Sequence, residues 1–136
     1  MTSGYLLDTN ILIFLLRRLR PSILERMQQA SGSIYVSTIS VAELSYGASR
    51  SADPMRNRIA VEELLSRLNV ADFDAAAAHH SGEIRAELAA AGRPIGGYDV
   101  LLAGQARAAG LTMVTNNVGE FERVPGLSVE DWSVEP

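Results

Sequence analysis

The sequence contains neither cysteine nor lysine among its 136 residues. The absence of cysteine excludes a disulfide framework, thiolate-bound zinc, iron–sulfur clusters and a cysteine nucleophile. The absence of lysine excludes a Walker-type phosphate loop and Schiff-base chemistry, because both need the lysine amine. Every basic residue is therefore an arginine, and the formal net charge is −4. This balance argues against a surface that is basic throughout, but it leaves room for local arginine clusters.

Long apolar runs are also lacking. The run from Ile11 to Leu16 is followed by Arg17 and Arg18, and it is far shorter than the roughly 20 apolar residues that cross a bilayer. The N-terminus lacks the basic start and the small-residue cleavage site of a signal peptide. We therefore expect a cytoplasmic protein. The length and the 47% hydrophobic content predict one globular domain over residues 1–136.

Predicted strands and helices alternate along the chain. The strands are expected at residues 4–7, 34–38, 69–72, 111–115 and 129–132. The helices are expected at residues 11–18, 22–30, 40–49, 54–68, 74–91 and 97–109. Such alternation predicts an α/β fold with a mainly parallel sheet and helices on both of its faces.

Three carboxylates stand where a sheet of this kind binds its ligands, beyond the carboxyl ends of the strands. Asp8 directly follows the first predicted strand, Glu43 lies in the first helical turn after the second strand, and Asp99 lies in the first turn of a later helix. Acids that meet at one sheet edge repel one another, and a divalent cation relieves that repulsion. Oxygen ligands without cysteine favour Mg²⁺ or Mn²⁺.

Each acid also has a local explanation. Asp8 can cap the first helix, and Asp99 can oppose the dipole of its own helix. Glu43 stands three residues after Ser40, which is the spacing of a capping box. His79 and Glu83 are four residues apart on a predicted helix, but two ligands are too few for a closed metal site. We expect a structural or surface role for this last pair, with local packing for one of the two histidines at 79 and 80.

Four segments of the sequence resemble the signature segments of PIN-domain ribonucleases, and most of all the VapC toxins of bacterial toxin–antitoxin pairs. They are Leu-Asp-Thr-Asn at 7–10, Ser-Val-Ala-Glu-Leu at 40–44, Pro-Ile-Gly-Gly-Tyr-Asp at 94–99 and Val-Thr-Asn-Asn at 114–117. The resemblance runs from Leu6 to Trp132 and includes the segment 120–127. Asp-Thr-Asn alone is a weak signal, but four such segments in order, in a chain of this length, are a strong one.

The resemblance implies a three-layer α/β/α sandwich and magnesium-dependent cleavage of structured RNA, such as a transfer RNA. It assigns the metal ligands to Asp8, Glu43 and Asp99, with Mn²⁺ as a substitute for Mg²⁺. Many members carry a fourth acid where this chain has Asn117, which puts a second metal ion in doubt. Asn117 can still orient a water molecule or a phosphate. Glu120 can replace the missing acid, although we expect it to be a surface residue.

The resemblance also implies partners, namely a small antitoxin, a second toxin copy, and operator DNA bound through the antitoxin. The apolar segment 11–24 is either an interface for such a partner or part of the core. The arginines expected to contact RNA phosphates, unless they only cover solvated helix faces, are Arg17, Arg18, Arg20, Arg85, Arg93 and Arg107. An alternative is a catalytically weak binding module that acts through its antitoxin. A small-molecule phosphatase is less favoured, because no glycine loop is present to cradle a phosphate.

Overall fold

The structure is a computed structural model that describes residues 4–30 and 32–134. Its centre is a five-stranded sheet in the order β3-β2-β1-β4-β5. The strands are β1 (Gly4–Leu7), β2 (Ser33–Ser37), β3 (Asn69–Ala71), β4 (Thr112–Val114) and β5 (Val129–Glu130). Every strand pair is parallel. The chain moves outward from β1 in one direction to β3 and in the other to β5, so the strand order reverses between β1 and β4.

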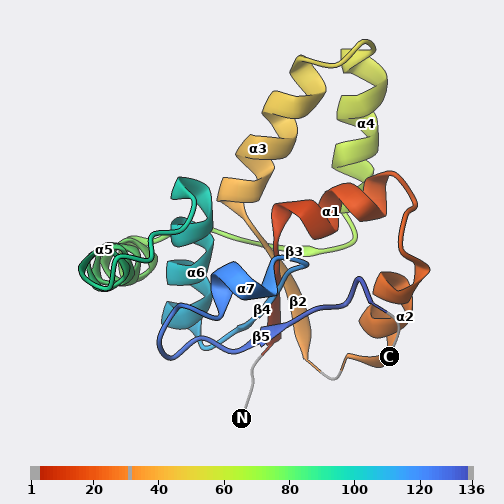
Figure 1. Ribbon diagram of the computed structural model, residues 1–136. Coiled ribbons are helices and arrows are strands. Elements are labelled where there is room, and N and C mark those ends of the chain that lie inside the picture. Colours follow the sequence, from red (N-terminus) through yellow and green to blue (C-terminus); the bar gives the residue numbers. More distant parts are fainter. Residues whose placement is uncertain (1–3, 31, 135–136) are drawn as a thin grey trace.

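Helices cover both faces of this sheet, and the predicted α/β/α sandwich is confirmed (Figure 1). One layer contains α1 (Thr9–Leu16), α2 (Pro21–Gln29), α3 (Thr38–Ser49) and α4 (Pro54–Leu65). The other contains α5 (Ala75–Ala90), α6 (Gly97–Ala109) and the single-turn α7 (Val118–Phe121). Successive side chains of a strand point to opposite faces. Leu6 accordingly packs in the core under α5 and α6, whereas Leu7 packs in the core under α1 to α4.

Most element boundaries lie within two residues of the predicted ones. The first helix begins at Thr9 rather than Ile11, immediately after β1. The last strand ends at Glu130, two residues before the predicted end. The sequence did not predict α7, because four residues are too few to display a helical period. No helix within the described residues is long and apolar enough to cross a membrane.

The helices α5 and α6 approach each other closely at Gly104. A Cβ atom at this position would lie 2.6 Å from the backbone nitrogen of Ser81 and 2.8 Å from its Cα atom. Glycine is therefore required where the two helices meet. This contact fixes α6 against α5 at Ser81, which is buried and donates its hydroxyl to the carbonyl of Ala77. The start of α6, which carries Asp99, is positioned by this packing.

Candidate active site

Asp8 occupies the point where the strand order reverses. It directly follows β1, is only 4% exposed, and its backbone N–H donates to the carbonyl of Val114 at the end of β4. Its side chain makes no strict capping hydrogen bond to α1, although the backbone N–H groups of Thr9 and Asn10 are close enough to lower its pKa. Instead the hydroxyl of Thr115 donates to Asp8 Oδ2 at 2.7 Å. Burial raises the pKa of Asp8 above its ordinary value, and the hydrogen bond from Thr115 offsets part of that rise.

Glu43 is held beside the start of α1 and does not form the capping box considered from the sequence. The cap of α3 is Ser37, whose hydroxyl oxygen accepts from the backbone N–H of Ile39 at 3.0 Å. The helix thus begins earlier than the sequence suggested, and Ser40 lies inside it. The hydroxyl of Thr9 donates to Glu43 Oε1 at 2.7 Å and lies 2.8 Å from the hydroxyl of Ser40. Thr9, the residue that directly follows Asp8, therefore holds the carboxylate of Glu43 beside the start of α1.

Asp99 is half-buried in the first turn of α6 and has the most perturbed carboxyl group of the site. Its pKa rises to about 7, first because burial removes water and then because the negative charges of Glu120, Asp8 and Glu43 oppose its ionisation. A hydrogen bond between the carboxyl groups of Asp99 and Glu120 adds to the effect. Two carboxyl groups in such contact must share a proton or a cation.

Glu120 belongs to this site, which corrects its interpretation as a surface residue. Its Oε1 atom accepts from the backbone N–H of Gly96 at 2.6 Å, and its Oε2 atom accepts from the side-chain amide of Asn117. The short helix α7 brings it there, and this helix was not predicted. The sequence signal for Glu120 was its acid type, three residues after the position where many family members carry their fourth acid.

Asn117 connects the two halves of the site. Its backbone N–H donates to Thr115 Oγ1 at 2.9 Å, while its side chain holds Glu120. Thr115 in turn holds Asp8. A continuous set of hydrogen bonds therefore runs from the buried acid after β1 to the acid on α7. In this arrangement the Asn117 amide orients an acid of the site.

The acids lie near enough to affect one another's ionisation, but they are not drawn together around one point. Among residues 4–30 and 32–134, no three histidine, aspartate or glutamate side chains are grouped closely enough to hold a metal ion as they stand. The donor set nevertheless fits a hard cation, because it consists of carboxylate oxygens whose repulsion raises the pKa of Asp99.

His79 is exposed on α5, whereas His80 and Glu83 on the same helix both contact Arg107. The Arg107 guanidinium donates to His80 Nδ1 at 3.0 Å, to Glu83 at 3.2 Å and to the carbonyl of Pro125 at 3.1 Å. Its side chain is only 14% exposed. Arg107 therefore joins α5, α6 and the segment after α7, and its contact with RNA phosphates stays a prediction. The other arginines of that prediction remain candidates.

The chain is similar in sequence and in fold to proteins of one family. The family model described as PIN domain matches residues 5–127. The tRNA(fMet)-specific endonuclease VapC of Shigella flexneri is 50% identical over 129 residues, which cover 95% of this chain and 98% of that protein. The solved DNA-bound VapBC of Salmonella typhimurium matches with a TM-score of 0.90 and 47% identity, over 97% of this chain and 99% of that one. VapBC2 of Rickettsia felis, solved with a fragment of promoter DNA, matches with a TM-score of 0.90 and 37% identity, over 95% and 98%.

Proposed function

Because this chain belongs to the PIN-domain family and is a VapC-type ribonuclease toxin, we propose that it hydrolyses phosphodiester bonds of structured RNA at a magnesium site formed by Asp8, Glu43 and Asp99. The observation that supports the proposal is the electrostatic environment of Asp99, whose pKa is raised to about 7 by burial and by the negative charges of Glu120, Asp8 and Glu43. Perturbed carboxyl groups of this kind are concentrated at catalytic and ion-binding sites.

The protein side chains have distinct tasks in this proposal. Asp8 and Asp99 bind the ion, and Glu43 binds it directly or through water. Thr115 keeps the carboxylate of Asp8 oriented, and Thr9 does the same for Glu43. When bound, Mg²⁺ supplies a water of lowered pKa and neutralises charge on the phosphate that is attacked, and Mn²⁺ can supply the same chemistry. The expected products carry a 5′-phosphate and a 3′-hydroxyl group.

We assign Glu120 the place of the fourth acid. It contacts Asp99 directly and is fixed by Gly96 and Asn117, so it contributes charge where position 117 contributes none. Asn117 then serves the reaction by orienting Glu120, in addition to any contact with water or phosphate. The negative charge of Glu120 affects how many ions the site can bind. A titration of the protein with Mn²⁺ measures that number.

The first substrate to test is transfer RNA, since the relative from Shigella flexneri is named for cleavage of tRNA(fMet). The purified protein is incubated with total tRNA in Mg²⁺ or in EDTA, beside Asp8→Asn and Asp99→Asn, and the new RNA ends are sequenced. Cleavage that needs Mg²⁺ and both acids supports the proposal. Retained cleavage by the two variants, with folds confirmed by circular dichroism, contradicts it.

The same digest tests the alternative of a catalytically weak binding module. The observation that favours this alternative is the absence, among the described residues, of three metal-ligating side chains already gathered in one place. A module of this kind leaves tRNA intact in Mg²⁺ and in Mn²⁺ but still binds its antitoxin.

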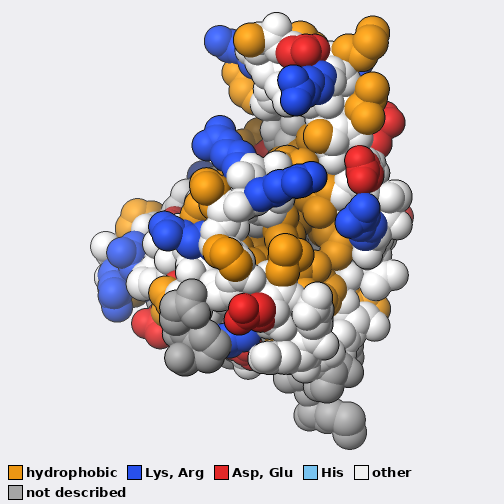
Figure 2. Space-filling view, turned by 90° about the vertical axis from the view of Figure 1, so that its right-hand side faces the viewer, with side chains coloured by type: hydrophobic (Ala, Val, Ile, Leu, Met, Phe, Trp, Pro, Cys, Tyr) orange, Lys and Arg blue, Asp and Glu red, His pale blue; other side chains and the backbone are white. Residues whose placement is uncertain are grey.

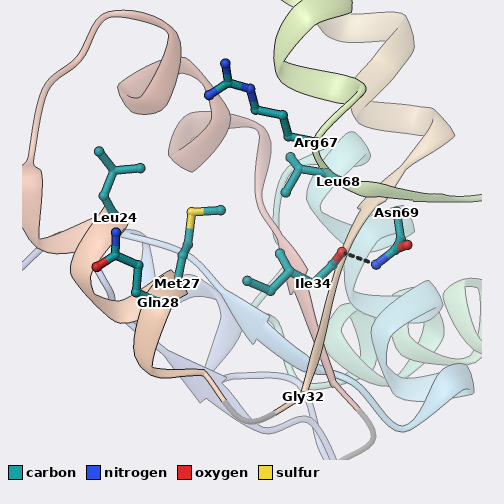
Figure 3. Close-up of a pocket in the computed structure, with 8 residues that line it drawn as sticks. All are labelled: Leu24, Met27, Gln28, Gly32, Ile34, Arg67, Leu68 and Asn69. Atoms are coloured by element: carbon teal, nitrogen blue, oxygen red, sulfur yellow. Dashed lines mark hydrogen bonds between the residues drawn. The ribbon is translucent and has the colours of Figure 1, made fainter.

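The antitoxin is proposed to contact the face built by α1, α2 and α4. The apolar segment 11–24 proves to be divided, because Ile11 and Ile23 are buried in the core whereas Leu19 and Leu24 are 49% and 56% exposed. On this side of the molecule apolar side chains gather between arginines (Figure 2). A cavity of about 380 Å³ opens there between α2 and the end of α4 (Figure 3). It is lined by Leu24, Met27, Gln28, Gly32, Ile34, Arg67, Leu68 and Asn69.

This surface suits an amphipathic peptide, because the lining is mostly apolar and the one charged residue among the lining residues is Arg67, which pairs with Glu63. The test is the affinity for the antitoxin encoded beside the gene. Leu24→Glu is expected to weaken that affinity more than tenfold, while Tyr46→Glu, on an exposed residue of α3, leaves it unchanged. Equal affinities would place the antitoxin elsewhere.

A further inference from the structure

A second cavity, on the opposite side of the sheet, shares a wall with the acidic site. It has a volume of about 650 Å³, which is within the range of small-ligand pockets. It lies between α5, the segment before α5, and the segment 94–101 at the start of α6. Its lining residues are Phe73, Ala78, Ser81, Gly82, Arg85, Leu88, Ala89, Pro94, Ile95, Gly97, Val100 and Leu101. None of the roles described so far uses this cavity.

The cavity and the acidic site are connected through a single stretch of backbone. Ile95 and Gly97 line the cavity, while Gly96, between them, donates its N–H to Glu120 on the other side. A Cβ atom on Gly96 would lie 3.1 Å from a carboxylate oxygen of Asp99. The segment 95–97 therefore contributes both to the wall of the cavity and to the hydrogen bonds of the acidic site.

The chemistry of the lining indicates what the cavity accepts. The walls are mostly apolar, with the aromatic ring of Phe73, and Arg85 is the one charged residue among the lining residues. An apolar slot with an aromatic wall accommodates the face of a nucleobase, and a guanidinium at its border binds phosphate. RNA is commonly read through unpaired bases that leave the stack and enter such slots. An apolar peptide would provide no negatively charged partner for Arg85.

We propose that the cavity between α5 and the start of α6 binds one unpaired nucleobase of the RNA substrate, adjacent to the phosphate that is hydrolysed, with Arg85 contacting a neighbouring phosphate. This inference rests on the proposed ribonuclease function and adds a residue-level account of how the substrate is positioned. Phe73 and Arg85 are positioning residues in it, since neither contacts the acids. The cavity also gives the enzyme a preference for RNA with an unpaired loop over a continuous duplex.

Gly82 offers a direct way to close the cavity. It lies on α5 in the cavity wall, and nothing lies within 4 Å of a Cβ atom built there, so a larger side chain enters the empty space without a clash. The filling variant is Gly82→Leu. Its matched control is Ala86→Leu, an exposed position on the same helix that does not line the cavity. Arg85→Gln removes the charge and leaves the volume nearly unchanged.

The experiment uses a fluorescein-labelled RNA hairpin with an unpaired loop. Its binding is measured by fluorescence anisotropy in EDTA, and its cleavage in Mg²⁺. Gly82→Leu is expected to raise both Kd and KM at least about fivefold, the smallest effect expected from the loss of one stacked base. Arg85→Gln is expected to raise both values through the loss of a phosphate contact. The value of kcat is expected to stay within about twofold of wild type, and Ala86→Leu to behave as wild type.

A scan with abasic nucleotides then identifies the base. At one loop position, removal of the base is expected to raise Kd for the wild type but to have no further effect on Gly82→Leu. Effects that add at every position, or a Gly82→Leu protein with unchanged Kd, overturn the proposal. A change in antitoxin affinity or in sedimentation, with RNA binding unchanged, identifies the cavity as a protein interface and also overturns it. Absence of cleavage by the wild type contradicts the proposed function, whereas the Kd comparison in EDTA still decides the subsite.

Discussion

Thr115 donates its hydroxyl to Oδ2 of Asp8 at 2.7 Å, and this hydrogen bond joins the carboxyl ends of the two strands between which the strand order reverses. Both residues are buried, so water does not compete for the contact. The same hydroxyl oxygen accepts from the backbone N–H of Asn117. Thr115 therefore fixes the direction in which the carboxylate of Asp8 points and helps to keep it ionised, since its hydrogen bond lowers the pKa that burial raises.

Replacement of Thr115 by valine tests this role. The shape of the side chain is kept, but the donor to Asp8 is lost, so the pKa of Asp8 is expected to rise further. Loss of a group that orients a metal ligand typically costs about 10- to 100-fold in metal affinity. We expect the Mg²⁺ concentration for half-maximal cleavage to rise by about that factor. Thr115→Ser keeps the hydroxyl and is expected to restore most of the affinity; an equal loss in both variants would show that packing alone is affected.

The raised pKa of Asp99 predicts how the stability of the metal-free protein changes with pH. In the folded state this pKa is about 7, against an ordinary value of 3.8, so the folded protein holds a proton that the unfolded chain releases. The resulting stability is complete below about pH 4 and is lost as the pH rises toward and through 7. In EDTA, Asp99→Asn is expected to lack this loss of stability with rising pH, because its side-chain amide does not ionise. The Tm difference between the variant and the wild type is therefore expected to grow from pH 5 to pH 8.

Magnesium provides the control for this titration. Bound Mg²⁺ replaces the proton as the group that relieves repulsion among the acids, so it is expected to raise the Tm of the wild type more at pH 8 than at pH 5. Asp99→Asn is expected to respond weakly at both values. If, in EDTA, the Tm of the wild type rises relative to that of Asp99→Asn between pH 5 and pH 8, the result contradicts a raised pKa of Asp99.

Glu120 is expected to matter through its charge. The variant Glu120→Gln keeps an oxygen that can accept from the backbone of Gly96, but it removes the negative charge that opposes the ionisation of Asp99. We therefore expect the pKa of Asp99 to fall toward its ordinary value and the affinity for Mg²⁺ to fall with the lost ligand charge, by about tenfold.

The matched control for this charge is Glu122→Gln, on an exposed glutamate two residues away. Calorimetric titration of both variants with Mn²⁺ separates the two positions. A fall in affinity that is equal for both would show only the general effect of net charge. Wild-type affinity in Glu120→Gln would remove Glu120 from the ligand set.

The layers of the fold and the neighbourhood of the acids could be predicted because they follow from local patterns. Short apolar runs that end in Asp8 or in the segment after Val36 identify buried parallel strands, and parallel strands bring their carboxyl ends to one edge. The signal for the three acids lies in their positions directly after strands or at helix starts. Those positions are visible in the sequence without knowledge of the strand order.

What could not be predicted depends on contacts between distant residues. Ser37, not Ser40, caps α3, and this choice follows from where β2 ends against its neighbours. Glu120 reaches the backbone of Gly96, which is 24 residues away in the sequence. Arg107 on α6 donates hydrogen bonds to His80 and Glu83 on α5. No local period or spacing encodes such pairings, so an acid or arginine of this kind resembles a surface residue in sequence.

The packing of α5 on α6 at Gly104 yields the sharpest prediction on stability. In Gly104→Ala the new methyl group meets the backbone of Ser81, which can yield only if one helix moves. Overpacking of this kind costs about 1–3 kcal/mol, or roughly 3–10 °C in Tm for a chain of this length. Gly82→Ala, on α5 in open space, is the matched control and is expected to gain about 0.4–1 kcal/mol through the unfolded state. Because α6 carries Asp99, Gly104→Ala is also expected to weaken Mg²⁺ binding while Gly82→Ala does not; a Gly104→Ala protein as stable as wild type would mean that the two helices are not held this closely.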